Sequence, residues 1–162
     1  MVIVYCMGIG GNISNCPYLA SGKIGGVVYP EDSSASAAWW SSSYTTTNAN
    51  SQNDGATNTT TITEATGFSS AYAAGVCNAL GDGWYLPAVD EMSSIHKNEL
   101  ALNTAGANIL SQSYWTSTEY TPSINLSGAS FNNFAWFVGL GDGDQRDVAK
   151  NVSIRVRCAK QF

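Results

Sequence analysis

The sequence predicts an α+β fold, with two helices in the middle of the chain and short antiparallel strands near its end. Two stretches carry helical signals, the first over residues 68–83 and the second from Pro87 to Leu100. Apolar residues alternate with other residues over 135–140 and again over 154–158, which is the strand signal. Helices and strands in separate runs are typical of an α+β fold with an antiparallel sheet.

The first part of the chain is expected to contain little regular structure. Residues 24–29 form a short apolar run, which predicts one strand. Residues 34–67 are rich in Ser, Thr and Asn, with Trp39, Trp40 and Tyr44 as the main apolar anchors. We therefore expect this segment to run over the surface, with short strands at most near the Trp pair.

Both helices have recognisable ends. In the first, Ser69 or Ser70 can cap the start and Gly81 can end the helix in a left-handed conformation. The residues that share its inner face are Tyr72, Ala73, Val76, Cys77 and Leu80. A buried strand fragment, 84–86, precedes the second helix, in which Asp90 and Glu91 in the first turn complement the helix dipole. Its inner face comprises Val89, Met92, Ile95 or His96, and Leu100.

Strands are expected at 113–120, at 134–140 and at 152–162, with a hairpin turn in the Gly/Asp-rich stretch between the last two. Alternation along 134–140 places Trp136, Val138 and Leu140 on one face, which we expect to be the core face. Phe137 and Gly139 would then face solvent.

Length, composition and charge limit the classes of function. The 162 residues suit one domain, and the charged content of 12% leaves a surface rich in Ser, Thr and Asn, which is common outside the cytoplasm. A net charge of −5 without a Lys/Arg cluster argues against a nucleic-acid partner. No apolar run approaches the roughly 20 residues that span a bilayer, so membrane insertion is not expected. The apolar start lacks the basic region and cleavage site of a signal peptide.

The four cysteines predict two disulfides, Cys6–Cys16 around a Gly/Asn-rich loop and Cys77–Cys158 between the first helix and the last strand. Four buried free thiols are the alternative. A zinc site is disfavoured, because the chain has one histidine and no Cys-x-x-Cys pair. Disulfides imply an oxidising compartment.

Four motifs, in order, carry a family resemblance: residues 77–92 (CNALGDGWYLPAVDEM), 113–120 (SYWTSTEY), 135–138 (AWFV) and 154–160 (IRVRCAK). They resemble the landmarks of Lcl-type C-terminal domains, which are C-type-lectin-like modules named after a collagen-like bacterial adhesin. Ala88 departs from the usual Ser or Thr, which removes a capping hydroxyl, and Thr116 stands where Ser is usual. The resemblance implies one C-type-lectin-like domain over 24–162, preceded by an extension, 1–23, that contains the Cys6–Cys16 loop.

Residues 134–157 also resemble the variable region of proteins diversified by diversity-generating retroelements, in which adenine-specific mutagenesis scatters Asn codons. Aligned on that pattern, the constant positions are Ala135, Trp136, Val138, Gly143, Lys150, Asn151, Ser153, Arg155, Val156 and Arg157. The varied positions are Phe134, Phe137, Gly139, Gly141, Asp142, Asp144, Arg146, Asp147, Val148, Ala149, Val152 and Ile154. Each of these twelve residues can be reached from an AAC or AAT codon by changing adenines alone.

This resemblance implies a non-catalytic binding or adhesion module whose varied positions contact a partner. The partner would be a protein or glycan receptor on another cell, and the module would act at a cell surface, a pilus tip or a phage tail, alone or as a trimer that gains avidity. Exposed Phe134 and Phe137 would be unusual without a partner, and aromatic and Arg side chains are common hot spots. Asp142, Asp144 and Asp147 would add an acidic rim.

Two alternatives remain open at the level of the sequence. Asp142, Asp144 and Asp147 could bind Ca²⁺ in a sugar-binding lectin, although their spacing does not match the twelve-residue calcium loop. A relative of formylglycine-generating enzymes would need a reactive cysteine pair near the C-terminus, where only Cys158 is available. His96 is the only histidine, so a Ser-His-Asp set cannot be assembled, and we expect no catalytic residue, metal or cofactor. Arg155 and Arg157 are expected to bond loop carbonyls, or to pair with Glu119 or Asp90.

Overall fold

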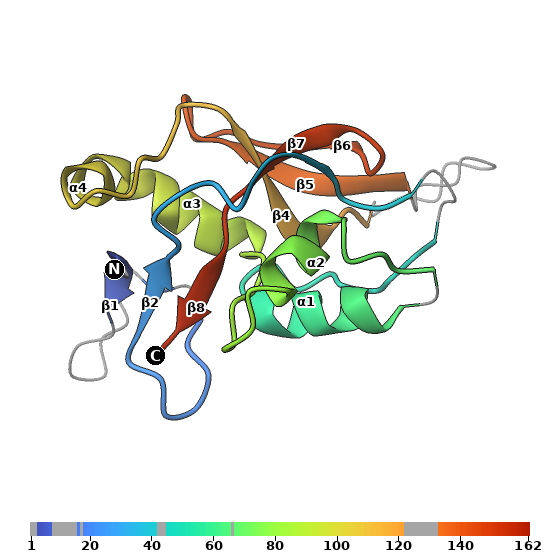
Figure 1. The fold of residues 1–162 in the computed structure, drawn as a ribbon, viewed down its shortest axis with the longest axis horizontal. Helices are drawn as coiled ribbons and strands as arrows, with labels where there is room; N and C mark the ends of the chain where they lie inside the picture. Colours follow the sequence, from blue (N-terminus) through green and yellow to red (C-terminus); the bar gives the residue numbers. More distant parts are fainter. Residues whose placement is uncertain (1–2, 8–15, 17, 42–44, 66, 122–132) are drawn as a thin grey trace.

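The computed structural model describes residues 3–7, 16, 18–41, 45–65, 67–121 and 133–162 (Figure 1). Helices and antiparallel strands are both present, which confirms the α+β class. The described residues contain four helices, twice the number expected from the sequence. In chain order the elements are β1 (Ile3–Met7), β2 (Gly25–Val28), β3 (Ser34–Ala38), α1 (Gly55–Glu64), α2 (Ala73–Asn78), α3 (Val89–Lys97), α4 (Glu99–Thr104), β4 (Ser113–Glu119), β5 (Phe134–Gly139), β6 (Gln145–Ala149), β7 (Ser153–Val156) and β8 (Ala159–Gln161).

The strands form two sheets. A small sheet has the order β1-β2-β8, and a larger sheet has the order β3-β7-β4-β5-β6. Neighbouring strands are antiparallel except β4 and β7, which meet in a parallel pairing at Tyr114 and Arg155. In Figure 1 the larger sheet lies at the top with α1 and α2 below it, and the small sheet, at the lower left, carries both chain ends.

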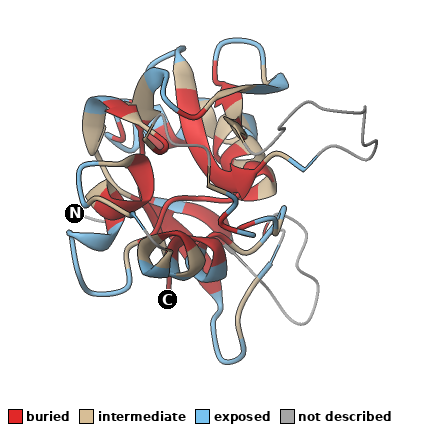
Figure 2. Ribbon diagram, turned by 90° about the vertical axis from the view of Figure 1, so that its right-hand side faces the viewer, coloured by how far each residue is buried: buried red, intermediate tan, exposed pale blue. Residues whose placement is uncertain are grey.

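Buried residues form two clusters, and β5 contributes to both. The first cluster brings Met92 and Ile95 of α3 together with Tyr114 and Val138. The second comprises mainly Trp39, Trp40, Ile62, Leu86, Trp115, Ala135 and Val156. Because successive residues of a strand point to opposite faces, the larger sheet is covered on both sides at its centre. Figure 2 shows the buried segments gathered in the interior and the exposed segments at turns and edges.

The helix α1 lies in the polar segment that was expected to run over the surface, so that prediction was wrong. Asp54 caps α1, with its Oδ1 accepting the Thr57 N–H at 2.9 Å. The inner face is polar: Asn58 and Thr59 are buried and bond the chain around them, and Ile62 is the large apolar residue among them. The sequence of α1 therefore lacks the apolar periodicity that would have predicted a helix. The Trp pair that precedes this helix is buried, with each side chain 1% exposed.

The two predicted helices exist, with different bounds. The helix α2 begins only after Tyr72, and Leu80 lies beyond its end and is exposed. The second predicted helix is split into α3 and α4 around Asn98. Ala88 has no hydroxyl to accept an N–H at the start of α3. Oγ1 of Thr118, in β4, accepts the Val89 N–H there at 3.1 Å.

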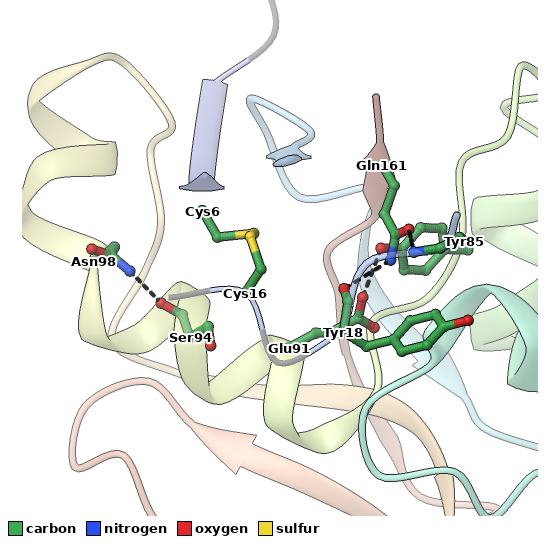
Figure 3. The surroundings of a disulfide bond; sticks show 9 residues. Cys6, Cys16, Tyr18, Tyr85, Glu91, Ser94, Asn98 and Gln161 are labelled. Carbon is green, nitrogen blue, oxygen red and sulfur yellow. Dashed lines mark hydrogen bonds between the residues drawn. A yellow bond between two sulfur atoms is a disulfide. The ribbon is translucent and has the colours of Figure 1, made fainter. Parts of the chain in front are cut away.

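Glu91 joins the starts of two helices from a fully buried position. Its Oε2 accepts the N–H groups of Gly55 (3.0 Å) and Ala88 (2.8 Å), and its Oε1 accepts the hydroxyl of Tyr85 (2.7 Å; Figure 3). A side chain at position 55 would collide with the carboxylate, since a Cβ there would lie 2.5 Å from Oε2. Burial raises the pKa of Glu91 to about 7, although these hydrogen bonds lower it.

Both predicted disulfides are present, and together they use all four cysteines. Cys6–Cys16 joins β1 to the segment before Tyr18, next to α3 (Figure 3). Cys77–Cys158 joins α2 to the link between β7 and β8. Two disulfides are compatible with an extracellular protein.

Arg155 and Arg157 have the expected structural role, but with an acid that the sequence did not indicate. Each donates to a carboxylate oxygen of Asp32, at 2.8 Å from Arg155 and 2.6 Å from Arg157. Neither Glu119 nor Asp90 is involved. The guanidinium of Arg157 also donates to the carbonyl groups of Tyr29, Ala107 and Asn108. These bonds hold the segment after β2 and the segment after α4 against the end of β7.

Removing the Cys77–Cys158 bond is expected to cost more stability than removing Cys6–Cys16. The two bonds close loops with sequence separations of 81 and 10 residues. On the loop-entropy estimate, Cys77→Ala/Cys158→Ala loses about 4 to 5 kcal/mol of unfolding free energy, and Cys6→Ala/Cys16→Ala loses about 3 kcal/mol. Urea denaturation of the two double variants measures the difference, and the reverse order would contradict the estimate.

Burial of Glu91 predicts a pH dependence. Between pH 4.5, the ordinary pKa, and pH 7, the unfolded chain releases this proton while the folded protein keeps it. The unfolding free energy of the wild type, relative to Glu91→Gln, should therefore fall by about 3 kcal/mol as the pH rises through this window. Urea titrations of both proteins at several pH values test this. A constant difference would show that the carboxyl group titrates normally in the folded protein.

Candidate binding surface

The hairpin formed by β5 and β6 carries most of the varied positions. Its strands pair in register from Phe134↔Ala149 to Val138↔Gln145, with Phe137 opposite Arg146. The strand β6 is at the edge of the larger sheet. The turn between the strands contributes three more varied positions, and the turn after β6, together with β7, contributes the last two.

Most varied positions lie at least partly on the surface. The exposed ones are Gly141, Asp142, Asp144, Arg146, Asp147 and Val152, and the half-buried ones are Phe134, Phe137, Val148, Ala149 and Ile154. Gly139 is buried. A Cβ at this glycine would lie 2.5 Å from Oδ1 of Asp142, so the turn folds directly over it.

The expectation that Phe137 and Gly139 face open solvent was wrong. Phe137 is half-buried, because it packs with Val148 and Ile154 against the second core cluster. Trp136, expected in the core, is only half-buried and makes an edge contact with Tyr120 at a centroid distance of 5.3 Å. Both faces of β5 are covered in part, and alternation alone cannot distinguish such a strand from one with a single core face.

The varied positions of the hairpin divide between its two sides. In an antiparallel pair, residues opposite each other point to the same side, so Phe137, Arg146 and Val148 share one side, which we call the Phe137 side. Phe134, Asp147 and Ala149 share the other with Trp136, and we call it the Trp136 side. The hairpin therefore presents its varied positions on two sides and not as one flat patch.

The turn between β5 and β6 is held by a surface ion network. One nitrogen of the Arg146 guanidinium donates to Asp142 and to Asp144, at 2.7 Å each. Arg146 lowers the pKa of Asp142, and Asp142 raises the pKa of Arg146. Two members of the expected acidic rim thus share one cation, which leaves this turn with a net charge of −1. Among the described residues, Asp147 has no charged partner.

Two shallow hollows lie beside the start of β4. The first, of about 210 Å³, is lined by Ser111, Gln112, Ser113, Gly139, Gly141, Asp142 and Arg146. The second, of about 270 Å³, is lined by Ala35, Gln112, Ser113, Ser153, Ile154 and Arg155. Gln112 and Ser113 border both hollows, although nothing in their own sequence context singled them out.

Beneath this surface, Lys150 is held by a buried network. Its side chain is 1% exposed and forms an ion pair with the buried carboxylate of Glu119. The ammonium group also donates to the carbonyl of Thr45 at 3.0 Å and lies 4.8 Å from the centre of the Trp39 ring. Desolvation lowers the pKa of Lys150, while Glu119 opposes that shift.

Glu119 completes this network with backbone bonds. Its carboxylate accepts the N–H groups of Thr47 and Asn48, the latter at 2.8 Å. The carbonyl of Lys150 in turn accepts the N–H groups of Trp39 (2.8 Å) and Trp40 (3.0 Å). The network therefore fixes the end of the hairpin to two distant segments of the chain.

The structure also describes the residues that a calcium-binding lectin or a relative of formylglycine-generating enzymes would use. Within the described residues, no group of three or more His, Cys, Asp and Glu side chains could hold a metal ion. Cys158, which the enzyme alternative needs as a reactive thiol, is in the disulfide with Cys77. His96 contacts the Leu140 carbonyl through Nδ1 at 3.0 Å, which ties α3 to the end of β5.

Comparison of the chain with models of known protein families, and with curated proteins, gives no match. Among the described helices, none has the length and apolar character needed to cross a membrane.

Lys150→Met is expected to destabilise the protein far more than Arg146→Ala. The first change leaves Glu119 buried without its counter-ion, which costs about 3 to 5 kcal/mol. The second removes an exposed ion network, and ion pairs in contact with water contribute little to stability. Urea denaturation measures both, and adding Glu119→Gln to Lys150→Met should recover part of the loss. Equal effects of the two single changes would contradict this account of the hairpin.

Proposed function

We propose that the chain is a non-catalytic binding module with a C-type-lectin-like fold, in which a fixed scaffold presents diversified positions to a receptor. The proposed contact residues are the twelve varied positions of 134–154, on the β5–β6 hairpin, its two flanking turns and β7. The receptor would be a protein or a glycan on another cell, reached from a cell surface, a pilus tip or a phage tail.

A contrast in burial within one short segment carries this proposal. Of the ten constant positions, five are buried: Ala135, Val138, Lys150, Val156 and Arg157. Of the twelve varied positions, only Gly139 is buried. Codons for Ala, Val and Arg can lack adenine, so adenine-specific mutagenesis would change the surface while sparing the buried Ala135, Val138 and Val156 and the Arg157 network.

The scaffold has properties that a diversified binder requires. The buried network of Lys150 holds the end of the hairpin, and two disulfides cross-link the rest of the scaffold, so little ordering entropy has to be lost when a partner binds. Phe134 and Phe137 are half-buried, which restricts their side chains and leaves part of each ring accessible. Rigid aromatic anchors of this kind are common in evolved binding surfaces.

The DNA around the gene tests the proposal directly. We expect a near-repeat of codons 114–158 close to a reverse-transcriptase gene, with mismatches only where the repeat carries adenine. Those mismatches should fall on the varied codons, such as those of Phe137, Arg146 and Asp147, and should leave the codons of Val156 and Arg157 intact. Sequencing the locus provides the measurement. A locus without the repeat, or mismatches at the codons of Val138, Val156 or Arg157, would contradict diversification by a retroelement.

A further inference from the structure

We infer that the partner of this surface is an extended, basic polypeptide segment that pairs as an added strand with the outer edge of β6. This inference rests on the proposed binding function and names the kind of partner and its mode of docking. Strand addition obtains affinity from main-chain hydrogen bonds and specificity from the side chains on either side of the edge.

The first observation is that β6 has an open edge. The bonds that flank its pairing with β5, Gly139 N–H to Asp144 O at 3.0 Å and Lys150 N–H to Asn133 O at 2.7 Å, join even-numbered residues of this stretch to β5. By the antiparallel alternation, Gln145 and Asp147 turn their backbone groups outward. Among the described residues, none bonds these groups, and residues 145–147 are exposed.

The second observation is the two-sided distribution of varied positions. A partner lying flat on one face of the hairpin would contact the Phe137 side or the Trp136 side, but not both. A strand added to the edge places its alternate side chains on both sides, next to Arg146 and Val148 on one and next to Asp147 and Ala149 on the other. Edge pairing therefore explains why consecutive positions of β6 are varied. Ile154, in β7, lies outside this contact, and the varied positions of β5 are separated from the added strand by β6 itself.

The charge of Asp147 indicates that the added strand belongs to a different protein and not to a second copy of this chain. Two copies of β6 paired antiparallel with full overlap would place Asp147 opposite its own copy, and like charges directly opposite destabilise a sheet. Arg146 is already engaged by Asp142 and Asp144, whereas Asp147 has no charged partner among the described residues. A Lys or Arg of the added strand opposite Asp147 would supply one, on a chain whose own net charge is −5.

Main-chain pairing also fits a surface whose side chains change. The outward N–H and C=O groups of β6 remain when the side chains of Arg146, Asp147 or Val148 are replaced, proline excepted. Each diversified version would thus keep a common source of affinity and alter only its preference for the partner's side chains.

The test uses short linear peptides of random sequence, displayed on phage and selected against the full chain. We expect binders in which a Lys or Arg recurs at one position among residues of strand-forming type. Their affinities are then measured for Asp147→Ala and Asp147→Pro. Both variants lack the carboxylate, but only the proline variant lacks the outward N–H, and proline is tolerated at this position of an edge strand. Asp147→Pro should bind at least about tenfold more weakly than Asp147→Ala.

If Asp147→Pro does not fold, a second measurement tests the inference. In the wild type, a bound peptide should slow hydrogen exchange at the amides of Gln145 and Asp147, and N-methylation of alternate peptide amides should abolish binding. Equal affinities of the two Asp147 variants, unchanged exchange, or no selected peptide would overturn the edge inference. A glycan from an array that binds the wild type and is lost in Phe137→Ala would also overturn it, while leaving the proposed binding function intact.

Discussion

The buried ion pair between Lys150 and Glu119 is the interaction on which the presentation of the hairpin depends. Removing two charges from water is costly, and the pair persists because its remaining polar atoms bond the backbone at Thr45, Thr47 and Asn48. The carbonyl of Lys150 also receives two N–H groups from the Trp pair of the segment after β3. One lysine at the end of β6 therefore ties the hairpin to the interior by bonds that involve none of the varied side chains.

Local chemistry predicted a large part of the fold. Pro87 and the acidic first turn located α3, the alternation from Trp136 to Leu140 located β5, and the spacing of the cysteines gave both disulfides. The helix α1 was not predicted, because its buried face contains Asn58 and Thr59, whose hydrogen bonds reach residues distant in the sequence. For the same reason, the sequence did not indicate Asp32, whose carboxylate pairs with Arg155 and Arg157. A polar residue shows its burial only once its partner has been placed beside it.

The shape of the candidate surface could not be predicted from the sequence. The codon pattern identified residues that the structure places mainly on one hairpin, but periodicity cannot reveal that both faces of β5 are covered. That coverage makes Phe137 half-buried and divides the varied positions between two sides. The hollows beside Gln112 and Ser113 were also missed, because they arise where the start of β4 meets β5 and β7, a juxtaposition that only the sheet order creates.

The position of β6 in the sheet explains why substitutions there would be tolerated. From Tyr114 to Glu119, every residue of β4 is buried, since β4 has strands on both sides and covered faces. A random substitution in β4 would create a cavity or bury an unpaired polar group, at a typical cost of about 2 to 5 kcal/mol. In β6, residues 145–147 are exposed and the next two are half-buried, so the same change costs little. An edge strand anchored at one end by a buried lysine therefore combines a fixed backbone with replaceable side chains.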